Sequence, residues 1–187
     1  QDVGVRFYTF ISSLGLIMEA AAENNKSVVV MDRPNLNADS VEGPVLKPEH
    51  KSFVGKFPIP VVYGLTIGEL AKMIHGERWM LTSGLDLSVI SMVGFDRKSP
   101  AMPEANPSSG LREPNALRAY PSICLFEPTI ISVGKGTDHP YVQYGIPDEK
   151  LGNIQFMPEV SPKHLNNLCL RPIRISVQAP VEVPASE

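Results

Sequence analysis

The sequence predicts an α/β fold of the doubly wound type, followed by a smaller proline-rich α+β domain. Three observations predict it: an amphipathic helix ahead of a short β-branched run, a second capped helix ahead of another apolar run, and an uneven spread of proline. The chain has 187 residues, 43% hydrophobic and 20% charged, which is enough for one large domain or two small ones. Of its 18 prolines, 13 follow residue 98. We therefore place the α/β domain at residues 1–97 and the auxiliary domain at residues 98–187.

The opening segment predicts an amphipathic helix that begins almost at once. Apolar residues between Phe7 and Ala21 recur at intervals of three and four, which places them on one helical face. Asn24 and Asn25 then end the helix, since Asn tolerates the left-handed conformation of a C-terminal cap. The β-branched run at 27–31 is typical of a strand buried on both faces of a parallel sheet. Helix, short turn and buried strand form half of a doubly wound unit.

The second helix carries the clearest local signals. Thr66 is its expected N-cap, and Glu69, three residues later, completes a capping box. Gly76 is expected to stop the helix. An apolar run at 87–93 then predicts the next strand.

The back half predicts less regular structure. Residues 96–114 are rich in Pro, Ser, Gly and charge, which indicates a long ordered loop. A short helix is expected at 115–120 and an edge strand at 170–177, where apolar and polar residues alternate around Pro172. Residues 180–187 are expected to form a frayed terminus.

Several classes of function are excluded. The net charge is −3 and no run of five like charges occurs, so we expect no nucleic-acid partner. No apolar run in this segment approaches the ~18 residues of a membrane span. No GxGxxG motif occurs, and in Gly134–Thr137 a glycine follows the lysine where a phosphate loop requires Ser or Thr. We therefore expect no nucleotide, and the two glycines are expected to allow a tight turn. The four histidines are widely spaced, so no metal and no cofactor are expected.

The two cysteines, Cys124 and Cys169, are far apart in the sequence and form no CxxC pair. A disulfide between them is one interpretation. Two buried free thiols are the favoured one.

Four segments in order carry a resemblance to a known family: QDVGVRFYTFISSL (1–14), VVVMDRPNLN with VEGPVL (28–46), PIPVVYGLTIGELAKMIHGE (58–77), and YPSICLFEPTIISVGKGT followed by PYVQYGIP (120–147). FMPEVSPKH (156–164) resembles the family's next segment. In order and spacing, the chain resembles the NamZ-type exo-β-N-acetylmuramidases from residue 1 to about residue 178. No single motif would be enough alone.

The resemblance implies a Rossmann-like catalytic domain and a smaller auxiliary domain with a cleft between them. It also implies a glycosidase that removes N-acetylmuramic acid from the non-reducing ends of bacterial peptidoglycan glycans. The expected partner is a peptidoglycan-derived glycan or muropeptide, and the expected location is secreted, periplasmic or cell-envelope associated.

Two features separate this chain from the family pattern. In the family, an upstream Glu-His-Gly segment carries the catalytic glutamate and lies ahead of QDVGVRFYT. The Rossmann-like domain is therefore expected to be incomplete at its N-terminus, and the 187 residues alone to be inactive. Where the family usually has Ser-Glu-Gly-Arg-Gly-Thr, this chain has Val133 in place of the Glu and Lys135 in place of the Arg. A non-catalytic module that binds cell-wall glycans is the alternative.

Glu42 is the expected catalytic residue of this segment. It lies in a loop after a predicted strand, and open α/β sheets bind ligands beyond the carboxyl ends of their strands. Glycoside hydrolysis commonly uses two carboxyl groups, one as acid and one as base or nucleophile. By residue type alone a loop glutamate is more often a solvated charge, and the resemblance favours the site. Glu42 would be the second carboxylate or an acceptor for a sugar hydroxyl.

Asp32 and Arg33 directly follow the strand at 27–31 and are the next candidates. A site role and an ion pair that closes the turn before Pro34 are both open. In the site role, Arg33 would grip the lactyl carboxylate of muramic acid, because guanidinium pairs well with carboxylate.

The remaining candidates for substrate binding come from both halves. Arg6 and Tyr8 are expected in the first turn of the opening helix, off its apolar face, although an interfacial tyrosine is the simpler interpretation of Tyr8. Asp2 is either an N-terminal cap, which the sequence favours, or a cleft residue, and Tyr63 and Trp79 are expected to be core or rim residues. In the back half the candidates are Glu127, Lys135, Thr137 and His139. We expect Tyr8, Arg33 and Glu42 to line one cleft, with the turn at 134–137 as its opposite wall.

Overall fold

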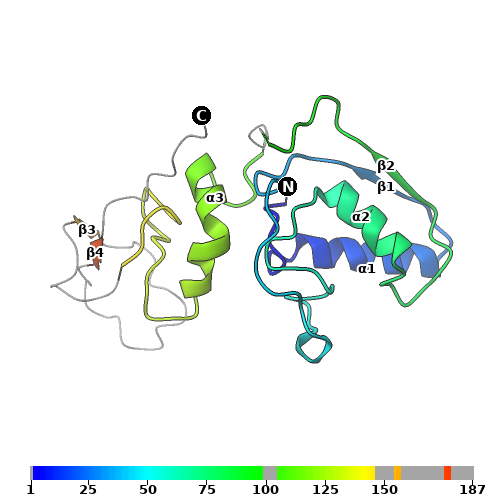
Figure 1. Cartoon of the computed structure of the whole chain (residues 1–187), viewed down its shortest axis with the longest axis horizontal. Coiled ribbons are helices and arrows are strands. Elements are labelled where there is room, and N and C mark those ends of the chain that lie inside the picture. The colour runs from blue at the N-terminus through cyan, green and yellow to red at the C-terminus, as the bar shows by residue number, and fades with distance from the viewer. Residues whose placement is uncertain (1, 99–104, 146–153, 157–174, 178–187) are drawn as a thin grey trace. The chain divides into compact units, whose positions relative to one another are not determined.

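The computed structural model describes residues 2–98, 105–145, 154–156 and 175–177. In chain order its elements are α1 (Phe10–Glu23), β1 (Val28–Met31), η1 (Pro48–His50), α2 (Ile67–Gly76), β2 (Leu87–Ile90), α3 (Pro114–Ile123), η2 (Cys124–Phe126), β3 (Ile154–Phe156) and β4 (Ile175–Val177) (Figure 1). The chain divides into two compact units, Gln1–Pro107 and Ser108–Glu187, which we call unit 1 and unit 2. The division falls ten residues beyond the expected boundary at residue 97.

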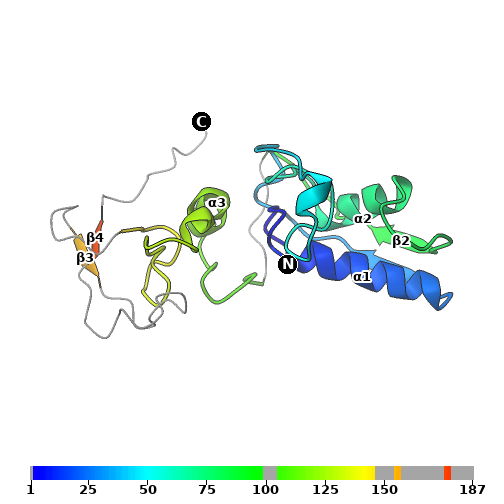
Figure 2. The same ribbon diagram turned by 90° about the horizontal axis from the view of Figure 1, so that it is seen from below.

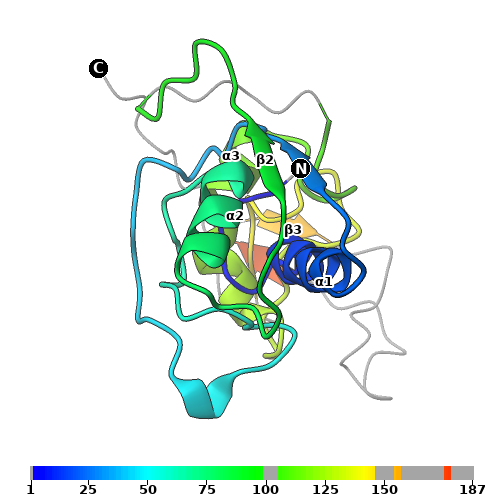
Figure 3. The same ribbon diagram turned by 90° about the vertical axis from the view of Figure 1, so that its right-hand side faces the viewer.

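Unit 1 is an α/β structure built on two parallel strands. β1 pairs with β2 in register from Val28 opposite Leu87 to Met31 opposite Ile90. Parallel neighbours need a crossover connection, and α2 lies within it. Helices α1 and α2 contact each other and lie on the same side of the strand pair (Figures 2 and 3).

Only one face of the strand pair is covered. Val30 is 8% exposed and belongs to the core with residues of α1 and α2. On the opposite face Val29, Met31 and Ile90 are 59%, 62% and 59% exposed. The prediction of a strand buried on both faces is therefore wrong for the described structure, because both helices pack on one side. The predicted run at 87–93 ends as a strand at Ile90.

Helix α1 begins later than expected, at Phe10 with Thr9 as its N-cap. The preceding backbone is engaged elsewhere: Val5 forms an antiparallel bridge with Val62. The Arg6 N–H also donates to the Val61 carbonyl at 2.8 Å. Because a residue cannot pair with residues 61–63 and also join a helix, α1 starts after this contact. Its predicted end is confirmed, since the cap is Asn24 and the next residue, Asn25, has φ +51°.

The capping box of α2 is confirmed. The Thr66 hydroxyl accepts from the Glu69 N–H at 3.2 Å, and the Glu69 carboxylate accepts from the Thr66 N–H at 2.8 Å. The helix ends at Gly76 as predicted. Tyr63 is a core residue, 4% exposed, and Trp79 stacks on Phe57 beside the core with ring centroids 6.0 Å apart.

In unit 2 the predicted short helix is confirmed as α3, which is longer than residues 115–120. β3 and β4 pair antiparallel, with Ile154 opposite Val177. The predicted strand at 170–177 is therefore present at 175–177, and its first part and the tail at 180–187 lie outside the described residues. No helix in the described ranges is long and apolar enough to span a membrane.

Cys124 is a free thiol in the core of unit 2. Burial and the neighbouring Glu127 raise its pKa to about 12, so the thiol stays protonated and unreactive. Cys169 lies outside the described residues.

Candidate functional site

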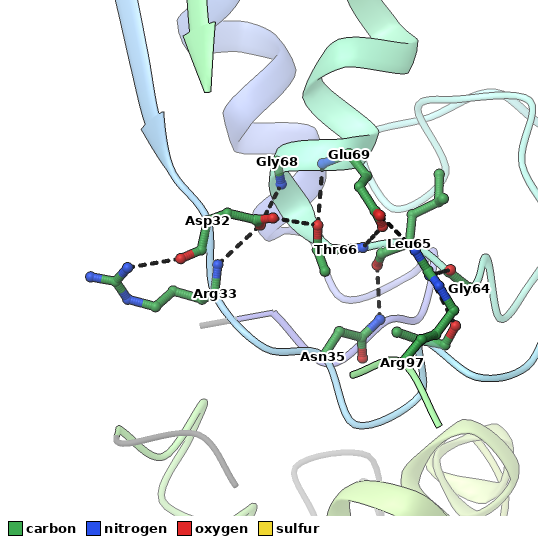
Figure 4. Close-up of polar contacts among 10 residues, drawn as sticks. Asp32, Arg33, Asn35, Gly64, Leu65, Thr66, Gly68, Glu69 and Arg97 are labelled. Atoms are coloured by element: carbon green, nitrogen blue, oxygen red, sulfur yellow. Dashed lines mark hydrogen bonds and ion pairs between the residues drawn. The ribbon is translucent and has the colours of Figure 1, made fainter. Parts of the chain in front are cut away.

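The carboxyl end of β1 leads into a cluster of buried polar residues, and Asp32 is the first of them. Its Oδ1 accepts from the Gly68 N–H at 2.8 Å and from the Arg33 N–H at 3.0 Å, while Oδ2 accepts from the Thr66 hydroxyl at 2.7 Å (Figure 4). A Cβ at Gly68 would lie 2.7 Å from the Asp32 carboxyl carbon, so this approach needs a glycine. Asp32 thus binds the first turn of α2, where the helix dipole favours negative charge.

Arg33 does not pair with the Asp32 carboxylate. Its guanidinium donates instead to the main-chain carbonyl of Asp32 at 2.8 Å, and the residue is exposed (Figure 4). The alternative of a turn-closing ion pair is therefore wrong, because the Asp32 carboxylate is occupied by the start of α2. An exposed guanidinium at the strand end remains compatible with binding an anion.

Two buried asparagines that sequence reasoning missed hold the loop after β1. Asn35 donates to the Leu65 carbonyl at 2.9 Å and accepts from the Asn37 N–H at 2.9 Å. Asn37 in turn donates to the Val3 carbonyl at 2.8 Å. Gly4, at φ +75°, packs directly on the Asn35 side chain. The available signal was the Asn-x-Asn spacing just after a predicted strand, a position where ligand-site loops begin.

Asp2 is buried and contacts Tyr63 rather than capping a helix, so that expectation is wrong. Its Oδ2 accepts from the Tyr63 hydroxyl and, at 3.2 Å, from the Gly4 N–H. Its Oδ1 is buried and has no hydrogen-bond partner among the described residues. Burial raises the pKa of Asp2 to about 7, against the opposing effect of the backbone hydrogen bonds.

Glu42 presents an exposed side chain from a fixed backbone. Its N–H donates to the Val62 carbonyl at 3.0 Å and its carbonyl accepts from the Val62 N–H at 2.9 Å. A Cβ at Gly64 would lie 2.6 Å from Val41 and 2.8 Å from the Ser40 carbonyl oxygen, so the residues before Glu42 pack closely on this glycine. No hydrogen bond or ion pair joins the Glu42 carboxylate to another described residue. Its carboxylate is therefore available from a well-defined position.

Arg6 and Tyr8 lie ahead of α1, so the expectation that they share its first turn is wrong. The Arg6 guanidinium donates to the carbonyls of Pro44 at 2.8 Å and Ile59 at 2.5 Å, and burial lowers its pKa. Arg6 thereby fastens the loop after Glu42. The Tyr8 and Phe10 rings pack edge-on, with their centroids 4.8 Å apart.

In unit 2 the structure brings Glu127 and Lys135 together. The Glu127 carboxylate accepts from Lys135 at 3.0 Å and from the Tyr141 hydroxyl at 2.9 Å. The Lys135 ammonium also lies 5.6 Å from the centre of the Tyr141 ring. Tyr141 holds φ +63°, an uncommon conformation for an aromatic residue, and burial together with Glu127 raises its pKa. Half of the Lys135 side chain, 53%, is still exposed.

The predicted tight turn at 134–137 is confirmed, with φ +74° at Gly134 and +78° at Gly136. The Thr137 hydroxyl donates to the Gly134 carbonyl at 2.6 Å and accepts from the His139 N–H at 3.2 Å. Thr137 therefore stabilises the turn, while His139 is exposed beside it. Within the described ranges no group of three or more His, Cys, Asp or Glu side chains is placed to hold a metal. The expected cleft joins residues of both units and stays a prediction.

Comparisons with known proteins match nearly the whole length of the chain. The model of the N-terminal domain of exo-β-N-acetylmuramidase NamZ matches residues 1–115, and the model of its C-terminal domain matches residues 118–181. The peptidoglycan β-N-acetylmuramidase NamZ of Bacillus subtilis is 41% identical over 90% of this chain.

Two crystal structures of DUF1343 family proteins from Bacteroides fragilis are also similar. One has a TM-score of 0.81 and 39% identity, and the other has a TM-score of 0.77 and 30% identity. Each match covers 95% of this chain. The chain spans about half the length of these proteins, with 45% of the Bacillus subtilis protein and 49% and 51% of the two crystallised chains covered. From its two domain matches, this chain belongs to the NamZ exo-β-N-acetylmuramidase family.

Proposed function

We propose that this chain contributes to an exo-acting glycosidase that releases N-acetylmuramic acid from the non-reducing ends of peptidoglycan-derived glycans. Membership of the NamZ family supports the reaction class. The structural observation that carries the proposal is the exposed Glu42 carboxylate on a backbone fixed by Val62. A secreted, periplasmic or envelope location belongs to the same proposal, because that is where such glycans lie.

Glu42 acts in this proposal on the attacking water or on a sugar hydroxyl. A carboxylate accepts a proton from water as the water oxygen adds to the anomeric carbon, while a second carboxyl group protonates the leaving oxygen. In this proposal the second group is the glutamate of the Glu-His-Gly segment that the family resemblance implies. An exposed carboxylate on a fixed backbone suits this role, because proton transfer requires the base within hydrogen-bond reach of the water.

Arg33 supplies the selectivity for muramic acid. This sugar differs from N-acetylglucosamine by a lactyl group that ends in a carboxylate, so a cation is the matching partner. Arg33 is exposed at the end of β1. We assign Arg33 to the lactyl carboxylate.

The finer architecture of unit 1 in this proposal is Rossmann-like and doubly wound. Parallel sheets occur almost only with both faces covered, and the β1–β2 pair has apolar side chains on its open face. A second helical layer over Val29, Met31 and Ile90 accounts for that open face. In a doubly wound sheet the carboxyl ends of the strands form the ligand edge, and Asp32 and Arg33 directly follow β1.

The test is hydrolysis of a chromogenic N-acetylmuramide by the complete natural polypeptide that contains this chain. We expect release of muramic acid, and a loss of about 10²-fold or more in kcat for Glu42→Gln, the scale of general acid–base help. Glu49→Gln is the control, because Glu49 of η1 is also an exposed carboxylate of unit 1. Full activity of Glu42→Gln would remove Glu42 from the site. Binding of muramyl glycans without hydrolysis would favour the glycan-binding module instead.

A further inference from the structure

Arg97, which follows β2, binds three separate segments of unit 1. One guanidinium nitrogen donates to the Ala38 carbonyl at 3.1 Å and to the Gly64 carbonyl. The other pairs with the Glu69 carboxylate at 2.5 Å (Figure 4). The loop after β1, the turn before α2 and the capping box of α2 therefore meet at one side chain.

Arg97 is linked by hydrogen bonds to Asp32 at the end of β1, through Glu69 and Thr66. Glu69 accepts from Arg97 with one oxygen and from the Thr66 N–H with the other. The Thr66 hydroxyl donates in turn to Asp32. Although burial opposes it, hydrogen bonds from Thr66 and from Arg97 lower the pKa of Glu69. The carboxylate therefore stays charged and the pairing holds across the neutral pH range.

The backbone from Ala38 to Glu42 is held at its start, along its middle and at its end. Arg97 holds its start through the Ala38 carbonyl, and the Val62 ladder holds its end at Glu42. Between them, residues 40 and 41 pack against Gly64, whose own carbonyl also accepts from Arg97. Arg97 thus holds both sides of this contact and joins them to α2. Without it, the stretch that leads to Glu42 loses the side chain that joins Ala38 and Gly64 to α2.

We propose that Arg97 is a positioning residue that sets where the Glu42 carboxylate stands. This proposal rests on the proposed function. The guanidinium is planar and offers several N–H groups at fixed angles, so one side chain can satisfy two carbonyls and a carboxylate. Lys carries the same charge on a single nitrogen and cannot reproduce that set. A group held by such contacts is pre-organised for reaction, and small misplacements of a reacting group lower the rate strongly.

The side chains of Arg97 and Glu69 are 39% and 37% exposed. Ion pairs at such positions contribute little to stability. Loss of Arg97 should therefore leave the fold intact and act on the position of the loop. This separates a positioning role from a purely structural one.

The experiment compares Arg97→Gln and Arg97→Lys with Lys56→Gln in the complete polypeptide. Lys56 pairs with Glu19 at 3.3 Å in the same unit, with side chains only 16% and 15% exposed. It therefore controls for loss of a more buried ion pair. We expect Arg97→Gln to lower kcat about tenfold with little change in KM, and Arg97→Lys to fall between. Lys56→Gln should keep the wild-type kcat even if its Tm drops further.

A double variant tests whether Arg97 acts through Glu42. If it does, Arg97→Gln adds no further loss of kcat in a Glu42→Gln background. Multiplied losses in the double variant would mean that Arg97 acts elsewhere and would overturn the proposal. The same holds for a wild-type kcat in Arg97→Gln.

Amide hydrogen exchange provides a readout that needs no activity. The N–H groups of Glu42 and Val62 form the ladder that ends the loop, and they should exchange faster in Arg97→Gln but not in Lys56→Gln. If the wild-type protein hydrolyses no muramide, the proposed function fails. Faster amide exchange of Glu42 and Val62 in Arg97→Gln would still show that Arg97 holds this part of the backbone. Hydrolysis with unchanged exchange in Arg97→Gln overturns the positioning role alone.

Discussion

The two faces of the β1–β2 pair carry the same kind of side chain and have different surroundings. Val30 is 8% exposed and its neighbour Val29 is 59% exposed. Val30 packs in a core that includes Leu70 and Ile74 of α2, whereas Val29 is exposed and lies outside that core. Residue type alone therefore does not set burial in this strand. The position of the covering helices does, and one of them, α2, comes much later in the chain than β1.

The largest expected effect lies on the covered face. Leu70 is fully buried within the core of unit 1, so Leu70→Ala removes apolar contacts and leaves a cavity. We expect a loss of about 2–5 kcal/mol in the free energy of unfolding, measured by urea denaturation. A loss below about 1 kcal/mol would show that the helices do not pack on this face as described.

Burial also changes the behaviour of an ionisable group, the carboxyl of Asp2. Its pKa is raised to about 7 in the folded protein from 3.8. The folded state therefore holds a proton that the unfolded chain releases near pH 4. Stability should fall as pH rises from about 4 to 7 and change no further above that range, by as much as about 4 kcal/mol.

Urea denaturation at several pH values, followed by Trp79 fluorescence, measures this slope. Asp2→Asn keeps the shape of the side chain without a titrating group, so the variant should lose the slope between pH 4 and 7. An unchanged pH dependence in Asp2→Asn would show that Asp2 is ionised and solvated in the folded protein.

The smallest expected effect is the difference in stability between a substitution on the covered face and one on the open face of the strand pair. In the 187-residue chain, Val30→Ala should cost about 1–2 kcal/mol and Val29→Ala less than about 0.5 kcal/mol. A second helical layer, as the doubly wound proposal requires, would raise the cost of Val29→Ala toward that of Val30→Ala. Unfolding of both variants in the chain and in the complete polypeptide provides the comparison. Equal, small costs for Val29→Ala in both would contradict the second layer.

Local signals predicted the helix ends well. The capping box of Thr66 and Glu69 is encoded within four consecutive residues, so it could be read directly from the sequence. The start of α1 was missed because Val5 pairs with Val62, a contact between residues 57 positions apart that no local pattern reveals. Burial on one face of β1 was missed for the same reason.

The sequence predicted where the polar residues of the candidate site lie better than it predicted what their side chains bind. Asp32 was expected beyond the strand, and it lies there, but its carboxylate binds Gly68 and Thr66 of α2. Arg6 likewise binds backbone carbonyls. Whether a polar side chain serves a ligand or the fold depends on which distant donors reach it, and Arg97 is the clearest example of a partner that only the structure reveals.

The bond between Asp32 and the start of α2 also bears on how the protein reaches its native state. α2 has ten residues, fewer than an isolated helix needs to persist in water. The carboxylate of Asp32, which directly follows β1, accepts a hydrogen bond from Thr66 at the start of this helix, 34 residues later. Closing that loop costs chain entropy, which is recovered only when the helix and the strand are both formed. The stability of α2 is therefore coupled to that of the β1 strand end, since each helps to hold the other in place.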